Sequence, residues 1–356
     1  MKTFQIALYP GDGIGPEVID QAVRVLEAAQ TKVGGFDLHM TRLPWGADYY
    51  MQHGYVAPPD FLKILRPFDA IFLGALGAPD RIPDHITLEP LVRIRQTFDQ
   101  YACVRPARLF PGLRSPLAVE GASQVDLVVV RENSEGEYVT CGGRFKVGEP
   151  DEFALQTAVH TRRGIERILR FGFELAQSRR QHLTMITKSN AQRYGFVLWD
   201  EIWEEMRGQY PMVRTDKQHA DAAAMNFVRC PDQFDVVVGS NLFGDILSDL
   251  GGIIGGGLGL APSANLNPER EYPSMFEPVH GSAPDIAGQG IANPVAAILS
   301  GAMMLEWLGL NQAAECIRQA VEATLSQGTG TPDLGGDLST GQMTDHIIQN
   351  LEAVGG

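Results

Sequence analysis

The stretch "IALYPGDGIGPEVI", residues 6–19, combines an apolar strand pattern, three closely spaced glycines and the start of an amphipathic helical pattern. It is similar to the strand–turn–helix that binds the pyrophosphate of a dinucleotide, whose fingerprint is G-x-G-x-x-G. The third glycine of that fingerprint should stand at position 16, which is Pro16. An acidic residue about twenty residues further on, at the end of a clear second strand, is also missing. We therefore interpret the stretch as a tight strand-to-helix turn, with Pro16 in the first helical turn, and not as a Rossmann fingerprint.

The composition around this turn is that of a globular enzyme. The 356 residues suffice for two domains or one large α/β unit, and the hydrophobic content is 44%. The net charge of -14 argues against nucleic acid or an anionic membrane surface as the main partner. The four cysteines form no C-x-x-C pair, and the sequence shows neither a signal-peptide pattern nor an apolar run long enough to span a bilayer. We expect a soluble cytoplasmic protein with no nucleic-acid or membrane partner.

Short apolar runs alternate with amphipathic segments, which is typical of α/β architecture. The runs are rich in Val, Ile and Leu, as in the strands of a central sheet covered on both faces. Between residues 139 and 160 a polar, glycine-containing segment interrupts the pattern, which fits either a hairpin arm that reaches a second subunit or a surface loop. The expected strands are 4–9, 69–76, 125–132, 183–189 and 234–241, and the expected helices are 15–30, 162–179, 244–258 and 296–309.

Three aspartates are candidate metal ligands. The segment "NLFGDILSDL", residues 241–250, places Asp245 and Asp249 four residues apart, hence on one face of a helix. Two carboxylates one turn apart repel each other unless a cation neutralises them, and a hard divalent cation such as Mg²⁺ or Mn²⁺ suits them. Asp221 precedes a helix-like run and is the third candidate. An exposed acidic face for the pair, and a helix cap for Asp221, are the alternative interpretations.

Three arginines, a tyrosine and a lysine are candidates for binding and proton transfer. The guanidinium group offers a planar fork to carboxylates, so three converging arginines would suit a small di- or tricarboxylate, whereas separate arginines are ordinary surface residues. A phenol is either a proton donor or a half-buried aromatic. A lysine at the end of an apolar strand is usually solvated, but beside a metal ion and arginines its pKa would fall and make it a general base. The candidates are Arg95, Arg105, Arg131, Tyr138 and Lys188.

Six motifs, in order and over essentially the full length, together resemble one family, the β-decarboxylating dehydrogenases that act on isopropylmalate, isocitrate, homoisocitrate, tartrate and D-malate. The motifs are "GDGIGPE", the Arg95/Arg105 pair, "RENSEGEY", "TKSN", "NLFGDILSD" and "FEPVHGSAPDIAGQGIANP". The resemblance implies an isopropylmalate dehydrogenase-like two-domain α/β fold with a central mixed sheet covered by helices on both faces, not a Rossmann fold. It implies a discontinuous cofactor-side domain, residues 1–99 and 255–356. It also implies a substrate and dimerisation domain, residues 100–254, with an intersubunit arm at about 139–160.

The resemblance also implies a role for each candidate residue. Arg95, Arg105 and Arg131 would bind the carboxylates of a 2-hydroxy acid, and Asp221, Asp245 and Asp249 would hold Mg²⁺ or Mn²⁺. Lys188 would be the base that removes the hydroxyl proton, and Tyr138 would protonate carbon after CO₂ is lost. Because the active site of this family is shared between subunits, Lys188 and Asp221 would come from the neighbouring chain of a homodimer.

The cofactor implied by the resemblance is NAD, with K⁺ as an optional further ion. Adenosine would bind near residues 277–294 and not at the opening turn. Asp285 followed by Ile286 resembles the NAD-preferring members, because a carboxylate accepts the ribose 2′-OH and repels a 2′-phosphate. The residues implied for the cofactor site are Glu89, Asn190, His280, Gly281, Ala283, Asp285, Ile286 and Asn293.

Several segments, among them "WGADYY" (45–50) and "SANLNPER" (263–270), resemble the tartrate and D-malate branch. We therefore expect oxidative decarboxylation of D-malate to pyruvate and CO₂, tartrate oxidation, or both. Glu89 and Pro90 depart from that branch, which usually has a tryptophan followed by small residues, and Leu91 and Val92 would suit a substrate alkyl group. The alternative is therefore 3-isopropylmalate or another 3-substituted malate. The alternative from another class is a non-catalytic paralogue that binds NAD or a dicarboxylate.

Overall fold

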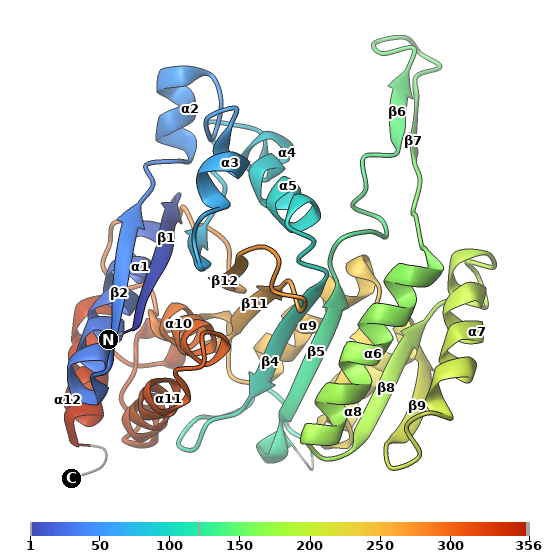
Figure 1. The fold of residues 1–356 in the computed structure, drawn as a ribbon. Coiled ribbons are helices and arrows are strands. Elements are labelled where there is room, and N and C mark those ends of the chain that lie inside the picture. The colour runs from blue at the N-terminus through green and yellow to red at the C-terminus, as the bar shows by residue number, and fades with distance from the viewer. Residues whose placement is uncertain (1, 120–121, 354–356) are drawn as a thin grey trace.

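A computed structural model of the chain describes residues 2–119 and 122–353, which form one large mixed sheet and a separate hairpin (Figure 1). Two parallel blocks make up the sheet, and an antiparallel pair of strands joins them in its centre. The order of the first block and the joining pair is β2 (Phe36–Arg42), β1 (Lys2–Gly11), β3 (Ala70–Ala75), β12 (Ser274–Pro278), β11 (Pro262–Leu266) and β4 (Ala102–Arg108). The second block continues with β5 (Asp126–Glu132), β10 (Val236–Gly239), β8 (His182–Thr187) and β9 (Arg214–His219).

Helices cover both faces of this sheet because its strands are apolar on both sides. Along β1, Ile6 and Leu8 enter one core cluster, whereas Ala7 and Tyr9 enter another on the opposite face. The first face is covered by α1 (Gly15–Val33), α6 (Arg162–Ser178), α7 (Gly195–Arg207), α10 (Val295–Trp307), α11 (Asn311–Ser326) and α12 (Thr340–Ala353). The opposite face is covered by α3 (Phe61–Leu65) and α5 (Glu89–Thr97) in the first block and by α8 (Ala220–Arg229) and α9 (Asn241–Ile254) in the second. Two short helices, α2 (Ala47–His53) and α4 (Asp84–Thr87), lie in the connections beside β2 and β3.

The turn after β1 is built from glycines because other loops approach it closely. Gly11 and Gly13 have positive φ angles of 71° and 56°. A Cβ atom on Gly13 would lie 1.9 Å from the carbonyl oxygen of Ser282, so only glycine allows this contact. Pro16 lies in the first turn of α1, as predicted. The predictions of an α/β fold and of a turn that is not a Rossmann fingerprint are confirmed.

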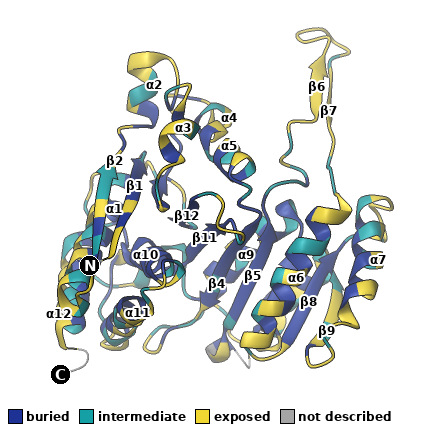
Figure 2. Ribbon diagram, in the orientation of Figure 1, coloured by how far each residue is buried: buried dark blue, intermediate teal, exposed yellow. Residues whose placement is uncertain are grey.

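The segment after β5 forms a two-stranded hairpin, β6 (Gly142–Phe145) and β7 (Phe153–Gln156), that projects from the body of the molecule (Figure 1). Every residue of both strands is exposed, in contrast to strands of the main sheet such as β3, β8 and β10, which are buried throughout (Figure 2). Its side chains include a stacked pair, Phe145 and Phe153, with ring centroids 4.9 Å apart. We call this hairpin the arm.

The predicted helix at 244–258 differs from the structure at both ends. It begins at Asn241, directly after Ser240, and it ends at Ile254, ahead of Gly256 and Gly257, whose φ angles of 115° and 134° cannot continue a helix. The four cysteines are free thiols. Among the described residues, no helix is long and apolar enough to span a membrane.

Candidate active site

Two arginines, a tyrosine and two aspartates meet where β4, β5 and α9 come together. Arg105 comes from β4, Arg131 from β5, Asp245 and Asp249 from α9, and Tyr138 from the segment between β5 and the arm. We call this group the acid–arginine cluster. Arg105, Arg131 and Tyr138 all donate hydrogen bonds to the carboxylate of Asp245. Arg105 Nη1 lies 3.0 Å from Asp245 Oδ1, Arg131 Nη1 donates to the same oxygen, and the Tyr138 hydroxyl donates to Oδ2 at 2.9 Å.

The local sequence of α9 explains how this cluster is held. Gly244 lets the helix pack directly on Arg131, since a Cβ atom there would lie 2.7 Å from that of Arg131. Asn241, one turn before Asp245, accepts from Arg131 Nε at 2.9 Å. Ser248, on the next turn, accepts from Arg105 Nη1 at 2.8 Å. Both arginine side chains are therefore almost fully buried, at 8% and 2% exposure, and fixed in orientation.

Burial and ion pairing set the charges of the cluster. Burial opposes the ionisation of Asp245, but the guanidinium of Arg131, followed by that of Arg105, outweighs it and holds the pKa of this carboxyl below its usual range. Burial and the neighbouring Arg105 lower the pKa of Arg131 to about 10, so its side chain remains charged at neutral pH. Burial raises the pKa of Tyr138, and the Asp245 carboxylate raises it further, so the phenol keeps its proton.

Arg95 has a different hydrogen-bond partner from the two other candidate arginines. Its Nη2 donates to Glu277 Oε1 at 2.7 Å, and both side chains are 9% exposed. Asn265 Nδ2 donates to the same carboxylate oxygen at 2.7 Å. Arg95 Nε is buried and has no hydrogen-bond partner within residues 2–119 and 122–353, so this guanidinium retains a donor for an incoming group.

The three candidate metal ligands are divided between two places. Asp249 extends the acid–arginine cluster, with its Oδ1 at 3.4 Å from Arg105 Nη1, and burial raises the pKa of its carboxyl. Asp221, in the first turn of α8, instead accepts from Lys188 Nζ at 2.9 Å. Within the described part of a single chain, no three His, Cys, Asp or Glu side chains form a group that could hold a metal ion.

The Lys188–Asp221 pair differs from the cluster in being open to solvent. The side chains of Lys188 and Asp221 are 26% and 66% exposed. The hydrogen bond that Lys188 donates lowers the pKa of the Asp221 carboxyl. Behind the pair, Asp200 accepts from the hydroxyls of Thr187 and Ser189 and so fixes the chain on both sides of Lys188. Asn190, a candidate for the cofactor, is exposed on the same loop.

Most of the candidates for the cofactor lie on the loop that follows β12. The turn after β1 contacts this loop, because the Ile14 N–H donates to the Ser282 carbonyl at 2.8 Å. His280 Nδ1 lies 3.0 Å from the Gly281 carbonyl oxygen, and Nε2 is buried without a hydrogen-bond partner among the residues that the structure describes. Burial lowers the pKa of this imidazole, so it is neutral at pH 7. The other candidates here are Ala283, with a positive φ of 38°, the exposed Asp285, Ile286 against the core, and Asn293, which donates to Asp333. Glu89 lies apart on α5 and pairs with Arg93 at 3.2 Å.

Four polar residues that the sequence did not single out support the site. Asn241 and Ser248 could have been found from their spacing, because they flank Asp245 at one helical turn on either side. Glu277 contacts Arg95, 182 positions away in the chain, and Asp200 contacts Thr187, 13 positions away. No local sequence pattern predicts either contact.

The ten-stranded mixed sheet places buried arginines next to aspartates, an arrangement that suits a small carboxylate ligand. Residues 5–347 match the family described as isocitrate/isopropylmalate dehydrogenase. The chain is 52% identical to the D-malate dehydrogenase [decarboxylating] of Escherichia coli (strain K12), over 98% of this chain and 99% of that protein. It is 50% identical to the tartrate dehydrogenase/decarboxylase of Pseudomonas putida, over 98% of each. A crystal structure of isocitrate dehydrogenase from Methylococcus capsulatus aligns with a TM-score of 0.88 and 39% identity, over 98% of this chain and 99% of that one.

The chain belongs to the isocitrate/isopropylmalate dehydrogenase family. The predicted family, its fold and the class of enzyme, a dehydrogenase that acts on a CH–OH group, are thereby confirmed. The roles of individual residues stay predictions and are taken up below.

Proposed function

We propose that this protein oxidises and decarboxylates a 2-hydroxy dicarboxylate, D-malate or tartrate, with NAD and a divalent metal ion. The observation that carries the proposal is the acid–arginine cluster, which provides fixed cationic forks for carboxylates beside oxygen ligands for a metal. The printed activities of relatives that are 50–52% identical over nearly the whole chain support the substrate class.

The residues present fit a hard divalent cation. Carboxylate oxygens are the ligands that Mg²⁺ and Mn²⁺ prefer, and Asp245 and Asp249 offer them one helical turn apart. A third ligand, Asp221, fits only if it comes from a second copy of the chain, since in its own chain it pairs with Lys188 away from the cluster. The bound cation would act as a Lewis acid at the substrate hydroxyl and carboxylate, and NAD would accept the hydride.

The residues near the loop after β12 fit the adenosine part of NAD. Nδ1 of His280 faces the Gly281 carbonyl oxygen, so it carries the imidazole proton and Nε2 is left as a buried acceptor for the amino group of an adenine. Asp285 is exposed and is free to accept the 2′-OH of a ribose, whereas it would repel a 2′-phosphate. These contacts favour NAD over NADP.

The proton transfers follow from the charges of the side chains. Arg95, Arg105 and Arg131 would hold the substrate carboxylates. Lys188, as the neutral amine that the positive charge of a bound metal ion and of the arginines favours, would take the proton of the hydroxyl group while hydride leaves the same carbon for NAD. Loss of CO₂ leaves electrons on carbon, and Tyr138, whose raised pKa keeps the phenol protonated, supplies the proton that completes the 2-oxo acid. Binding of the substrate requires Arg105 and Arg131 to share their donors between Asp245 and the substrate.

Two exposed apolar surfaces support a homodimer with shared sites. The first is the arm, where Phe145, Val147, Phe153 and Leu155 are 45–65% exposed. The second is an outer face of α8 and α9, where Met225, Val228, Ile246 and Ile253 are 42–64% exposed. Apolar surface of this kind marks protein interfaces. In such a dimer we assign residues 1–99 and 255–356 to the cofactor side and residues 100–254 to the substrate and dimer side.

A second candidate substrate is a 3-substituted malate such as 3-isopropylmalate. In its favour, Val92 lies one turn before Arg95 on α5 and is only partly buried. Leu91 packs against the core, and so it offers less to a substrate than the sequence suggested.

The test is NADH formation with D-malate, the tartrate isomers and 3-isopropylmalate, each with Mg²⁺ or Mn²⁺ and with or without K⁺. We expect the kcat/KM for D-malate or a tartrate to lead by about tenfold or more, which corresponds to about 1.4 kcal/mol of transition-state preference. A lead for 3-isopropylmalate would contradict the substrate assignment. No metal-dependent NADH formation with any of these acids would favour a binding protein without catalysis.

A further inference from the structure

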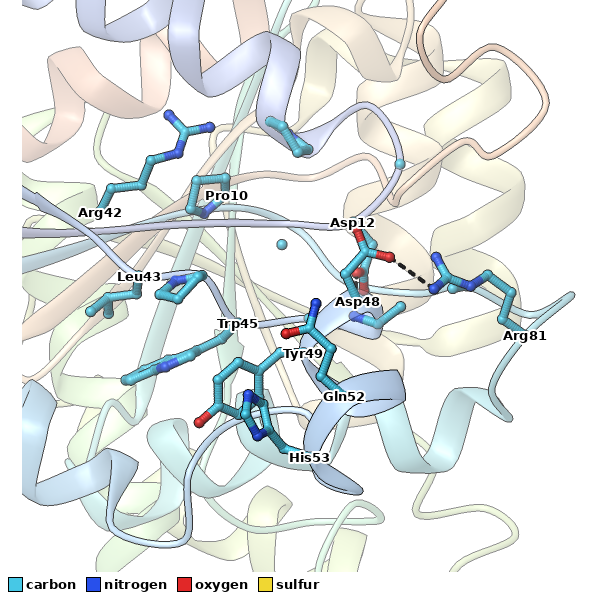
Figure 3. Close-up of a pocket in the computed structure, with 17 residues that line it drawn as sticks. Pro10, Asp12, Arg42, Leu43, Trp45, Asp48, Tyr49, Gln52, His53 and Arg81 are labelled. Carbon is cyan, nitrogen blue, oxygen red and sulfur yellow. Dashed lines mark hydrogen bonds and ion pairs between the residues drawn. The ribbon is translucent and has the colours of Figure 1, made fainter.

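A cavity of about 520 Å³ opens beside α2, away from the acid–arginine cluster (Figure 3). Its walls come from the turn after β1, the loop after β2 and the outer side of α2. None of the residues assigned above to the substrate, metal or cofactor lines it. Its volume lies within the range of cavities that hold small molecules.

The topology places this cavity where ligands commonly bind. From β1 the chain passes to α1 on one face of the sheet, and from β2 it passes to α2 and α3 on the way to β3, with α3 packed on the opposite face. Adjacent parallel strands whose connections leave on opposite faces form a crevice at their carboxyl ends, and such crevices are the usual ligand sites of α/β sheets. The cavity lies at this crevice between β1 and β2.

Aromatic rings form one wall of the cavity. The Tyr49 and His53 rings have centroids 4.2 Å apart, one turn from each other on α2 (Figure 3). Trp45 lies behind them, buried to 5% exposure and fixed edge-on against Tyr9 at 5.4 Å. A planar ring can lie against such a wall, because aromatic side chains supply large contact area and defined stacking geometry.

Two arginines with N–H donors to spare line the cavity. Arg42 bonds to Asp20 and Arg81 to Asp48 through one guanidinium nitrogen each, at 2.5 Å and 2.8 Å, and both pairs are solvent-exposed. An exposed pair of this kind is weak, and each guanidinium keeps further N–H donors. The buried carboxylate in the wall, Asp12, already accepts the backbone N–H groups of Ala47 and Gly77 at 2.6 Å and 3.0 Å. The donors left over therefore favour an anion.

We propose that this cavity binds a small aromatic anion, with its ring against Tyr49 and His53 and its carboxylate or phosphate group on the N–H donors of Arg81 that Asp48 leaves free. The Gln52 carboxamide faces the same space and offers a further N–H donor (Figure 3). This site is separate from the proposed dehydrogenase site, and it does not depend on which 2-hydroxy acid is oxidised.

Calorimetric titration of the full-length protein with phenyl phosphate tests the proposal. The 2-hydroxy acid that gives the highest kcat/KM in the NADH assay is present at saturation so that the arginines of the acid–arginine cluster are occupied. We expect one saturable site, and we expect inorganic phosphate alone and phenol alone to bind at least about tenfold more weakly, because each lacks one half of the contacts. The absence of a saturable site for phenyl phosphate would overturn the proposal.

Three variants locate the site. Arg81→Gln and Tyr49→Leu should each raise the Kd for phenyl phosphate by about tenfold or more. Arg24→Gln is the matched control, because Arg24 forms an equally exposed ion pair with Asp345 on a different surface, and its Kd should not change. Equal Kd values for all three variants, each with the melting temperature of the unmodified protein, would place the binding elsewhere and contradict the assignment.

Discussion

The acid–arginine cluster and the Lys188–Asp221 pair are both built from charged side chains, but they differ in burial. In the cluster, the Arg131 side chain is 2% exposed, and its hydrogen bonds to Asn241 and Asp245 fix its orientation. In the pair, Asp221 is 66% exposed and contacts solvent on its free side. The exposed side of the Lys188–Asp221 pair is open to a further group, and under our proposal that group belongs to the acid–arginine cluster of a second chain.

The largest expected effect comes from removing the carboxylate on which the cluster converges. Asp245→Asn should lower kcat/KM by about 10³-fold, because both the metal ligand and the partner of Arg105 and Arg131 are lost. Mn²⁺ binding, followed by electron paramagnetic resonance, should weaken in parallel. Asp345→Asn, which removes an exposed ion pair, is the control. A variant that keeps both activity and Mn²⁺ affinity would contradict the role of the cluster.

The next prediction tests whether the exposed Lys188–Asp221 pair serves catalysis and not stability. Lys188→Ala should lower kcat by about 10²- to 10⁴-fold, as expected for the loss of a general base, yet leave the melting temperature almost unchanged because the pair is exposed. Steady-state kinetics and calorimetry check both parts. A large fall in the melting temperature with kcat intact would mean that the pair is structural.

An apolar residue on the dimer face should matter more than an equally exposed one elsewhere. Met225→Glu, at 64% exposure on α8, should raise the dissociation constant of the dimer by about 10- to 100-fold. Met51→Glu, at 63% exposure on α2, should leave it unchanged. Sedimentation at a series of concentrations measures both, and equal effects of the two substitutions would exclude this face as the interface.

The last effect, on stability and not on activity, concerns a buried acid next to the cluster. Burial raises the pKa of Glu132 to about 7 from a usual value near 4.5. The folded state therefore binds a proton that the unfolded state releases, so this carboxyl favours folding at low pH, and its contribution declines as pH rises from about 4.5 through 7. Glu132→Gln should remove this decline, about 3 kcal/mol in all. Denaturant unfolding of both proteins across this pH range tests it, and identical slopes would show that Glu132 does not titrate as proposed.

The sequence predicted the central strands well because they are continuous apolar runs. The expected strands leave out β2, β4, β9, β11 and β12, and β11 and β4 are the pair that joins the two parallel blocks. For β11 and β12 the reason is that residues 262–278 carry prolines, asparagines and a charged turn instead of a clean apolar run. The sequence places the end of α9 too late because the apolar pattern continues past Ile254, whereas Gly256 and Gly257 adopt positive φ. In the site, spacing alone brought Asp245 and Asp249 together, whereas the Arg95–Glu277 pair depends on a contact across 182 positions.

The most direct test of a shared site is complementation between two inactive variants. Equal amounts of the Asp245→Asn and Lys188→Ala chains are mixed, unfolded and refolded together. NADH formation from D-malate is then compared with that of each variant refolded alone. If Lys188 of one chain serves the cluster of the other, half of the dimers are hybrids with one intact site, and activity should return to about a quarter of that of the unmodified enzyme. Activity no higher than that of the separate variants, in samples where hybrid dimers are shown to form, would mean that each chain completes its own site.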